Sequence, residues 1–322
     1  MLEDLDPPSF EFGRGRGERE REERLGEDPF EEEPEIIVRR VDEEDQAGPR
    51  RRFRLIPEMS ETTARVVVAI PWVIFAIAIV GVGGEPFAAA MIVLAVLGLR
   101  EFFRMAEPER PFLLPAYAVA AGMMIAAHYG SAFQVVLVLA AIFPLTFIFA
   151  AARRSHEAIT ISVAFTVLGV AWMGLGFSHA VLLRDLPTHG GALLIDVLVA
   201  TFLNDTAAYA AGRLFGTRKI TPRISPNKTL EGAIGGFLGA TLGFWFAGLY
   251  QDWLPGIDAL VIGMCIGAIA PIGDLFASLV KRDLGAKDTG HLFGPHGGLI
   301  DRLDAVLFTV VAGYYLAVGF VY

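Results

Sequence analysis

Long hydrophobic runs separated by short polar segments dominate the chain from about residue 65 onward. Nine of these runs have the roughly 17 to 25 residues that an α-helix needs to cross the hydrocarbon core of a bilayer. They cover residues 65–83, 86–104, 112–129, 132–151, 158–183, 191–214, 232–250, 256–280 and 299–321. The pattern predicts an all-α, polytopic integral membrane protein with about nine transmembrane helices.

Basic side chains between the runs indicate how these helices are oriented. Lysine and arginine concentrate in cytoplasmic loops of membrane proteins. Here they cluster before the first run and after the second, fourth, sixth and eighth runs, whereas the loops on the opposite side contain only Arg184. We therefore expect a cytoplasmic amino terminus, and two large polar loops that face the cytoplasm from the inner (plasma) membrane of the cell.

Composition supports a membrane protein with a polar extension. Hydrophobic residues make up 54% of the chain, and its mean hydropathy is +0.50. The net charge of -9 arises from residues 1–48, which contain 18 acidic residues and 7 arginines. We expect residues 1–60 to be a disordered acidic cytoplasmic tail, residues 61–190 to form the first transmembrane helices, and residues 191–322 to form a catalytic transmembrane region with cytoplasmic loops.

Two polar segments precede the hydrophobic run that begins at residue 232. In the first segment, Asp205 and Tyr209 lie one helical turn apart and share a helix face. The second segment, residues 225–232, is predicted to be a loop that enters the next helix. Lys228 and the free amides of that helix start would suit phosphate oxygens, with Ser225 or Thr229 as a helix cap or ligand.

A third polar segment, residues 273–304, carries the highest density of charge. Residues 278–304 contain four basic side chains, four aspartates and five glycines. One helical stripe is expected to present Asp274, Ser278, Lys281 and Arg282. Asp301 and Asp304 are expected to share one face at the start of the last helix. Pro271 and Gly273 are expected to kink the helix before the stripe and to free carbonyl groups there.

Buried aspartates in a membrane need a partner. Each costs about 2.5 to 3.5 kcal/mol near the bilayer centre when it is unpaired. Asp205, Asp274, Asp301 and Asp304 together suit a hard cation, because carboxylate oxygens are the ligands that such ions prefer. The alternative is that these carboxylates only pair with nearby lysines and arginines.

For several other polar residues and glycines we expect smaller roles. His296 stands before Gly297 and Gly298, where a glycine-rich backbone can wrap an anion, so we expect it to position substrate or loop rather than metal. Glu101 and Asp196 are expected to be interfacial groups without a specific role. The glycine rows at residues 235, 239 and 243 and at 263 and 267 favour close helix packing within the chain, with a dimer face as the alternative.

The order of these polar residues resembles that of the phosphatidate cytidylyltransferases, also called CDP-diacylglycerol synthases. The specific resemblance covers residues 204–304, about a third of the chain. It rests on the succession Ser278, Lys281, Arg282, Lys287, Asp288, Gly290, His296, Gly297, Gly298, Asp301, Arg302 and Asp304, together with the two earlier polar segments. The chain departs from the family at Gly294 and Pro295, where family members more often have proline followed by glycine.

This resemblance implies transfer of CMP from CTP to phosphatidate, which gives CDP-diacylglycerol and pyrophosphate. It implies Mg²⁺ with a further K⁺, a homodimer, and contact with membrane lipid but not with nucleic acid. The implied catalytic residues are Asp274, Lys281, Arg282, Lys287, Asp288, Asp301, Arg302 and Asp304. The implied substrate-binding residues are Asp205, Tyr209, Ser225, Asn227, Lys228, Thr229, Ser278, His296, Gly297 and Gly298. The implied metal ligands are Asp274, Asp301, Asp304 and Asp205.

Two other functions remain open at the level of the sequence. A CTP-dependent lipid kinase would transfer the γ-phosphoryl group in place of CMP. An ion-coupled transporter would use the buried carboxylates as a relay. The concentration of charge in loops on one side of the membrane disfavours the transporter.

Overall fold

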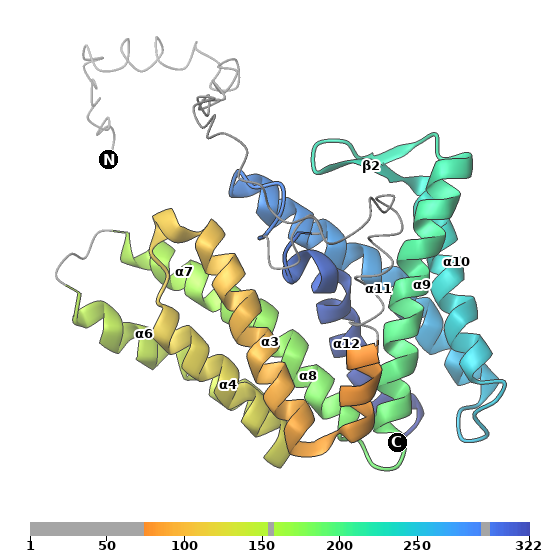
Figure 1. The fold of residues 1–322 in the computed structure, drawn as a ribbon, viewed down its shortest axis with the longest axis horizontal. Coiled ribbons are helices and arrows are strands. Elements are labelled where there is room, and N and C mark those ends of the chain that lie inside the picture. Colours follow the sequence, from red (N-terminus) through yellow and green to blue (C-terminus); the bar gives the residue numbers. More distant parts are fainter. Residues whose placement is uncertain (1–73, 154–157, 291–296) are drawn as a thin grey trace, which may run out of the picture. The chain divides into compact units, whose positions relative to one another are not determined.

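The computed structural model describes residues 74–153, 158–290 and 297–322, which all belong to one compact unit, Glu58–Tyr322. Figure 1 shows the arrangement of its helices. Before the first labelled helix, residues 74–82 are also helical. The elements are α3 (Gly84–Met105), η1 (Glu107–Glu109), α4 (Leu113–Tyr129), α5 (Ala132–Ala140), α6 (Ile142–Ala151), α7 (Ile159–Gly169), η2 (Val170–Gly174), α8 (Leu175–Arg184), α9 (Gly190–Phe215), β1 (Lys219–Thr221), β2 (Ser225–Thr229), α10 (Leu230–Ala247), α11 (Gly256–Asp283) and α12 (Ile300–Phe320).

The prediction of a polytopic helical membrane protein is confirmed. Within the described residues, seven helical segments are long and apolar enough to cross a membrane, and Leu113–Tyr129 is a shorter apolar helix. Two of the seven combine several elements, namely Ala132–Ala151 (α5 and α6) and Ile159–Arg184 (α7, η2 and α8). Most of the first predicted span, 65–83, and the predicted tail, 1–60, lie outside the described residues.

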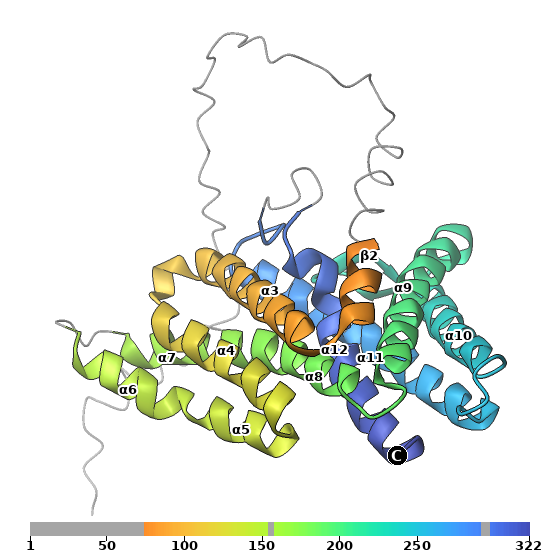
Figure 2. The same cartoon turned by 60° about the horizontal axis from the view of Figure 1, so that its bottom comes forward.

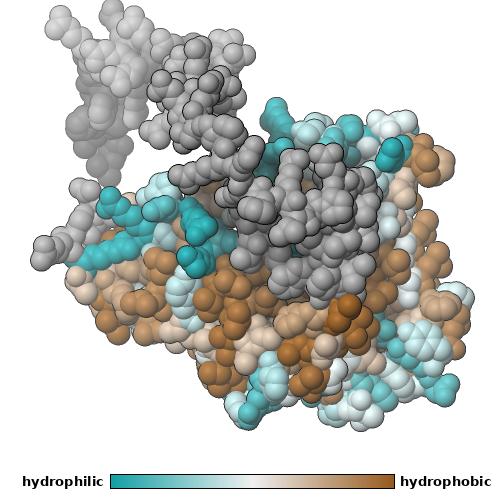
Figure 3. Space-filling view, viewed as in Figure 1, coloured by the Kyte–Doolittle hydropathy of each residue, from teal (hydrophilic) through white to brown (hydrophobic). Residues whose placement is uncertain are grey.

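The outer surface of the helices suits a lipid environment. Phe147 is 72% exposed and lies in a span with a hydropathy of 2.4. Figure 3 shows hydrophobic side chains over the middle of the visible face and hydrophilic ones toward its upper and lower ends. Such an apolar surface is large for a water-soluble protein, whereas lipid tails would cover it at little cost.

Helix α10 packs between α9 and α11 through small residues. A Cβ atom added to Gly239 on α10 would lie 2.6 Å from the Ala207 Cβ of α9. A Cβ added to Gly267 on α11 would lie 2.9 Å from the Phe237 carbonyl of α10. Both predicted glycine rows therefore serve packing within the chain, because only glycine lets the backbones approach this closely.

Helix α11 is continuous through Pro271, although proline has no N–H to donate to the carbonyl four residues earlier. That carbonyl belongs to Gly267, and it accepts a hydrogen bond of 3.1 Å from Nδ2 of the buried Asn204 on α9. The carbonyl that Pro271 was predicted to free therefore takes part in a contact between two helices. It fixes α9 against α11 one residue before Asp205.

A short antiparallel hairpin joins α9 to α10, where the sequence predicted a loop. Lys219 pairs with Thr229 across β1 and β2. Thr229 is also the N-cap of α10, and its hydroxyl accepts from the Gly232 amide at 3.1 Å, which confirms the predicted cap. Glu231 accepts from the Thr217 amide at 3.0 Å and so ties the base of the hairpin to α10.

Helix α12 lies between α8 and the pair of helices α9 and α11. It packs against α8 on one side and against α9 and α11 on the other, and Figure 2 shows it between α8 and α11. A Cβ added to Gly273 on α11 would lie 2.6 Å from the carbonyl oxygen of Asp304, so α11 and α12 approach closely beside Asp274. Gly273 therefore brings two of the predicted site residues together.

We predict that the Asn204–Gly267 hydrogen bond stabilises the fold because Pro271 leaves the Gly267 carbonyl without a helical partner. Asn204→Ala should lower the stability of the purified protein by about 1 kcal/mol. In a Pro271→Ala background the same substitution should cost less, since alanine at that position supplies the missing N–H. Thermal unfolding in detergent measures both effects.

Thr206→Ala is the matched control, because among the residues that the structure describes that exposed hydroxyl bonds only to the Phe202 carbonyl of its own helix. Equal losses from Asn204→Ala in the two backgrounds would contradict this explanation of the contact.

Candidate active site

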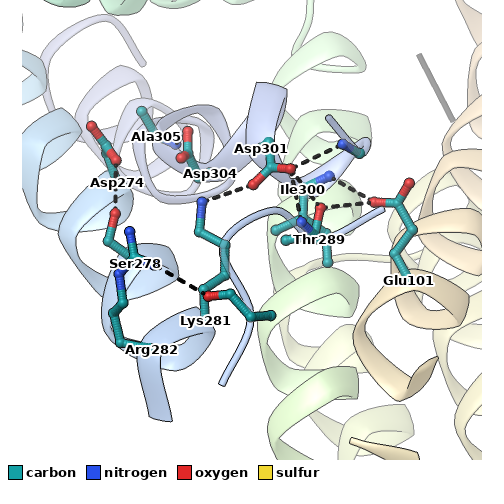
Figure 4. Close-up of polar contacts among 12 residues, drawn as sticks. Glu101, Asp274, Ser278, Lys281, Arg282, Thr289, Ile300, Asp301, Asp304 and Ala305 are labelled. Carbon is teal, nitrogen blue, oxygen red and sulfur yellow. Dashed lines mark hydrogen bonds and ion pairs between the residues drawn. The ribbon is translucent and has the colours of Figure 1, made fainter. Parts of the chain in front are cut away.

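The polar ends of several helices gather at one end of the bundle. In Figure 1 the C-terminal ends of α9 and α11, the hairpin and the N-terminal end of α12 all lie toward the top. The predicted stripe on α11 exists, because Asp274, Ser278 and Lys281 belong to one continuous helix. Figure 4 shows these side chains beside Asp301 and Asp304 of α12. The structure therefore brings the α11 and α12 residues of the predicted site together.

Asp274 of α11 makes two polar contacts. Its Oδ2 lies 2.6 Å from Nζ of Lys228, which comes from the end of the hairpin. The Ser278 hydroxyl, one helical turn further along, donates to Oδ1 at 3.4 Å. The side chains of Lys228 and Asp274 are 25% and 34% exposed, while the Nζ atom of Lys228 itself is buried.

Asp301 of α12 is held by donors from two other segments. Its Oδ1 lies 2.7 Å from Nζ of Lys281 on α11. Its Oδ2 accepts from the Thr289 amide at 2.9 Å, the Thr289 hydroxyl at 3.0 Å and the Gly298 amide at 2.9 Å. Gly297 has a φ of 83°, and a Cβ there would lie 2.7 Å from Asp301 Oδ2. Glycine is therefore required for the backbone to wrap this carboxylate.

Asp304 and Asp205 complete the acidic group. Asp304 accepts from the Ala305 amide at 2.8 Å and interacts electrostatically with Asp274 and Asp205. Asp205, exposed on α9, interacts electrostatically with Asp274 and Lys228. Lys228 is the nearby cation for Asp274 and Asp205, and Lys281 is the nearby cation for Asp304. The remaining negative charge favours binding of a further cation.

The chemistry of these donors fits a hard divalent ion that is shared with a substrate. Among the described residues, no three Asp, Glu, His or Cys side chains form a metal-holding group by themselves. Mg²⁺ is usually held by one or two carboxylates together with substrate phosphates and water. Asp274 and Asp304 offer such a pair, because Asp274 is 34% exposed and Asp304 accepts one hydrogen bond from the Ala305 amide. Asp301 is only 12% exposed, and four contacts from protein donors engage its oxygens.

Other predicted site residues lie around this centre. Tyr209 is 68% exposed, and its hydroxyl accepts from Arg213 at 3.1 Å. Arg282 donates to the Ala286 carbonyl at 3.5 Å. Asn227, Lys287, Asp288 and Arg302 are exposed, and Ser225 is half-buried. His296 lies outside the described residues.

Glu101 of α3 belongs to this polar centre, although no site role was expected for it. It is only 7% exposed, and its Oε2 accepts from the Thr289 hydroxyl at 3.2 Å and the Ile300 amide at 3.1 Å. The interpretation of Glu101 as an interfacial group without a role is therefore wrong. A glutamate within an otherwise apolar run was the available signal, because such a charge is costly in hydrocarbon unless it has a partner.

Asp196 was also expected to be an interfacial group, and it too is buried. Asp196 is 6% exposed and accepts from Gln251 Nε2 at 3.0 Å, so it ties α9 to the segment between α10 and α11.

Comparison with known proteins agrees with the resemblance that the sequence shows. The model of a family described as "Cytidylyltransferase family" matches residues 63–320. "Uncharacterized protein YnbB" of Escherichia coli (strain K12) is 40% identical over 158 residues, which are 47% of this chain and 53% of that protein. "Phosphatidate cytidylyltransferase" of Bacillus subtilis (strain 168) is 35% identical over 155 residues, 48% and 58% of the two chains.

A longer match covers most of another relative. "Phosphatidate cytidylyltransferase" of Synechocystis sp. (strain ATCC 27184 / PCC 6803 / Kazusa) is 29% identical over 292 residues, 80% of this chain and 96% of that protein. The matches to the Escherichia coli and Bacillus subtilis proteins span only a little over half of their lengths.

We predict that the Lys281–Asp301 pair stabilises the fold, because these side chains are only 14% and 12% exposed. Lys281→Met leaves a buried carboxylate without its counter-charge and should cost about 2 to 3 kcal/mol. Lys281→Met combined with Asp301→Asn should recover part of that loss, since the charge of Asp301 is then removed together with its partner. Thermal unfolding in detergent compares the variants.

Arg282→Met serves as the control on the same helix, because Arg282 is exposed and, within residues 74–153, 158–290 and 297–322, hydrogen-bonds only to a carbonyl at 3.5 Å. If Lys281→Met were no more harmful than this control, the pair would contribute nothing to stability.

Proposed function

Because this chain belongs to the cytidylyltransferase family, we propose that it transfers CMP from CTP to phosphatidate, with CDP-diacylglycerol and pyrophosphate as products. The names of the Bacillus subtilis and Synechocystis relatives support this choice of lipid. The observation that carries the proposal is the close approach of Asp274 and Asp304 beside Lys228 and Lys281. That arrangement combines cation ligands with phosphate-binding cations at the end of the helical bundle.

The proposed reaction joins two anions and needs no general base. An oxygen of the lipid phosphate, already an anion near neutral pH, forms a bond to the α-phosphorus of CTP. The bond from that phosphorus to the oxygen bridging the β-phosphorus breaks, and its electron pair leaves with pyrophosphate. The protein therefore has to hold the reactants in line and reduce their mutual repulsion.

The lysines of the site provide this neutralisation. Lys228 lies just before α10, whose Leu230 and Gly232 amides already donate to the Arg218 carbonyl and the Thr229 hydroxyl. The lysine, and not free amides of that helix start, would therefore meet phosphate. Lys228 balances Asp274 before substrate arrives, and its ammonium group can turn to phosphate oxygens of the bound reactants. Lys281 remains paired with Asp301 and contributes its positive charge from there. The exposed Arg282, Lys287 and Arg302 would attract the anionic substrates to the site.

Asp274 and Asp304, assisted by Asp205, are the residues that we assign to Mg²⁺. When bound there, Mg²⁺ would neutralise nucleotide phosphate charge and polarise the phosphorus–oxygen bonds. We assign Asp301 to the organisation of the loop and of α12, because its oxygens are taken up by Lys281, Thr289 and Gly298. K⁺ and a substrate contact by His296 remain predictions.

The proposal places the reaction on the cytoplasmic side of the membrane. The chain is an integral membrane protein with several spans, and the bias of basic residues predicts that the loops after α9 and α11 face the cytoplasm. CTP is available on that side. The division of the chain into residues 1–60, 61–190 and 191–322 is part of the same proposal.

A homodimer also remains a proposal. Both glycine rows of α10 and α11 are used within the chain, so a dimer would form through other surfaces. Light scattering of the detergent-solubilised protein measures its mass.

The proposed activity is tested with purified protein, phosphatidate, Mg²⁺ and CTP labelled at either the α- or the γ-phosphorus. We expect α-label to enter the lipid and γ-label to leave in pyrophosphate. Entry of γ-label alone would identify a lipid kinase. Ion flux without any nucleotide turnover would favour a transporter, a class that the family membership already disfavours.

The roles of the carboxylates give a further prediction. Asp274→Asn should reduce CMP transfer by about 100-fold or more, because it removes charge at the centre of the site. Asp258→Asn is the control, since Asp258 lies in the first turn of α11, about four helical turns before Asp274. Near-normal Mg²⁺-dependent turnover by folded Asp274→Asn protein would refute the assignment.

A further inference from the structure

Glu101 is a buried carboxylate that α3, a helix of the first half of the chain, contributes to the polar centre. It lies 188 residues from Thr289 and 199 residues from Ile300, the two residues that donate to its Oε2. Within the described residues, its other oxygen, Oε1, is buried without a hydrogen-bond partner. No lysine, arginine or histidine of the described ranges forms an ion pair with it.

The surrounding backbone is adapted to this side chain. A Cβ atom on Gly298 would lie 2.5 Å from Glu101 Oε2, and one on Gly290 would lie 3.1 Å from Oε1. A side chain at Gly298 would therefore collide with the carboxylate. Figure 4 shows Glu101 pointing from α3 toward Thr289 and Ile300. The two glycines let the segments before and after the 291–296 stretch reach the carboxylate together.

Glu101 also supplies the N-terminal cap that α12 lacks. The N-cap residue of α12, Leu299, has no side chain that can accept a hydrogen bond. The first amides of a helix lack partners within the helix and form its positive end. Glu101 accepts from the Ile300 amide of that first turn at 3.1 Å, so α3 supplies the cap that the local sequence lacks.

Thr289 couples Glu101 to Asp301. Its hydroxyl lies 3.2 Å from Glu101 Oε2 and 3.0 Å from Asp301 Oδ2, while its amide donates to Asp301 at 2.9 Å. A hydroxyl has one proton and two acceptor sites, so the two carboxylates share a single donor. A shift of Glu101 would therefore move Thr289, and Thr289 would move Asp301.

We propose that Glu101 is a positioning residue for the reaction proposed above: it fixes Thr289 and the first turn of α12, and thereby aims Asp301 and Asp304. This inference rests on the proposed function. It gives α3, which lies outside the residues that carry the motif, a role in the active site. Glu101 acts through Thr289 and the backbone and does not contact the reacting groups.

The test compares Glu101→Ala with Glu101→Gln, which retains an oxygen that can accept the same hydrogen bonds. Glu101→Ala should lower kcat by about 10- to 100-fold, the usual effect of losing a residue that orients a ligand-bearing group. The KM values for CTP and phosphatidate should change by less than about threefold, because the basic residues remain. Glu101→Gln should retain most of the kcat.

Two further variants separate positioning from general loss of structure. Thr289→Val removes the shared hydroxyl at nearly constant volume and should lower kcat as Glu101→Ala does, while Thr289→Ser should retain it. The double variant Glu101→Ala with Thr289→Val should be little worse than Glu101→Ala alone, because that variant has already lost the contact with Thr289. Glu107→Ala, an exposed glutamate just beyond α3, is the control without effect.

Hydrogen exchange at the Ile300 amide gives a readout that does not depend on activity. The exchange should be faster in Glu101→Ala than in wild type and Glu101→Gln. If Glu101→Ala retained kcat within about threefold and left this exchange unchanged, the inference would be overturned. If wild-type protein transferred no CMP, the proposed function would fail, and the exchange comparison would still decide whether Glu101 holds α12.

Discussion

Negative charge at the start of α12 has to be balanced within a bundle of apolar helices, and much of the local structure follows from how this is done. Asp301 is neutralised by Lys281 of α11 and receives three hydrogen bonds from Thr289 and Gly298. These contacts connect the end of α11, the following segment and α12. Because a buried charge without partners is costly, the carboxylate holds these elements in one arrangement.

The same constraint divides the carboxylates into two groups. Asp301 has its oxygens occupied by protein donors, whereas Asp274 is 34% exposed and held by Lys228 and a long contact from Ser278. Asp304 approaches Asp274 because Gly273 allows α11 and α12 to come together. One carboxylate therefore organises the site, and the others remain suited to a cation and the phosphates of substrates.

Features that depend on local spacing could be predicted from the sequence. The spans follow from the length of hydrophobic runs, and the stripe with Asp274, Ser278 and Lys281 follows from the helical period. The cap at Thr229 follows from its place before an apolar run. The family resemblance over residues 204–304 agrees with the family match over residues 63–320.

Features that depend on distant contacts could not be predicted. Glu101 meets Ile300 across 199 residues, and no local pattern reports such a pairing. The bond from Asn204 to the Gly267 carbonyl needs the spatial approach of α9 and α11, although Pro271 showed that a carbonyl would be free. The hairpin escaped prediction because its strands, KIT and SPNKT, are short and mostly polar.

The division of the carboxylates is the central claim, and binding of Mn²⁺ in place of Mg²⁺ tests it most directly. Electron paramagnetic resonance can follow Mn²⁺ titrated into nanodisc-embedded protein with CTP, for wild type, Asp274→Asn and Asp301→Asn. The account predicts that Asp274→Asn weakens Mn²⁺ binding by about tenfold or more, whereas folded Asp301→Asn protein still binds it. Loss of binding in Asp301→Asn together with normal binding in Asp274→Asn would contradict the account.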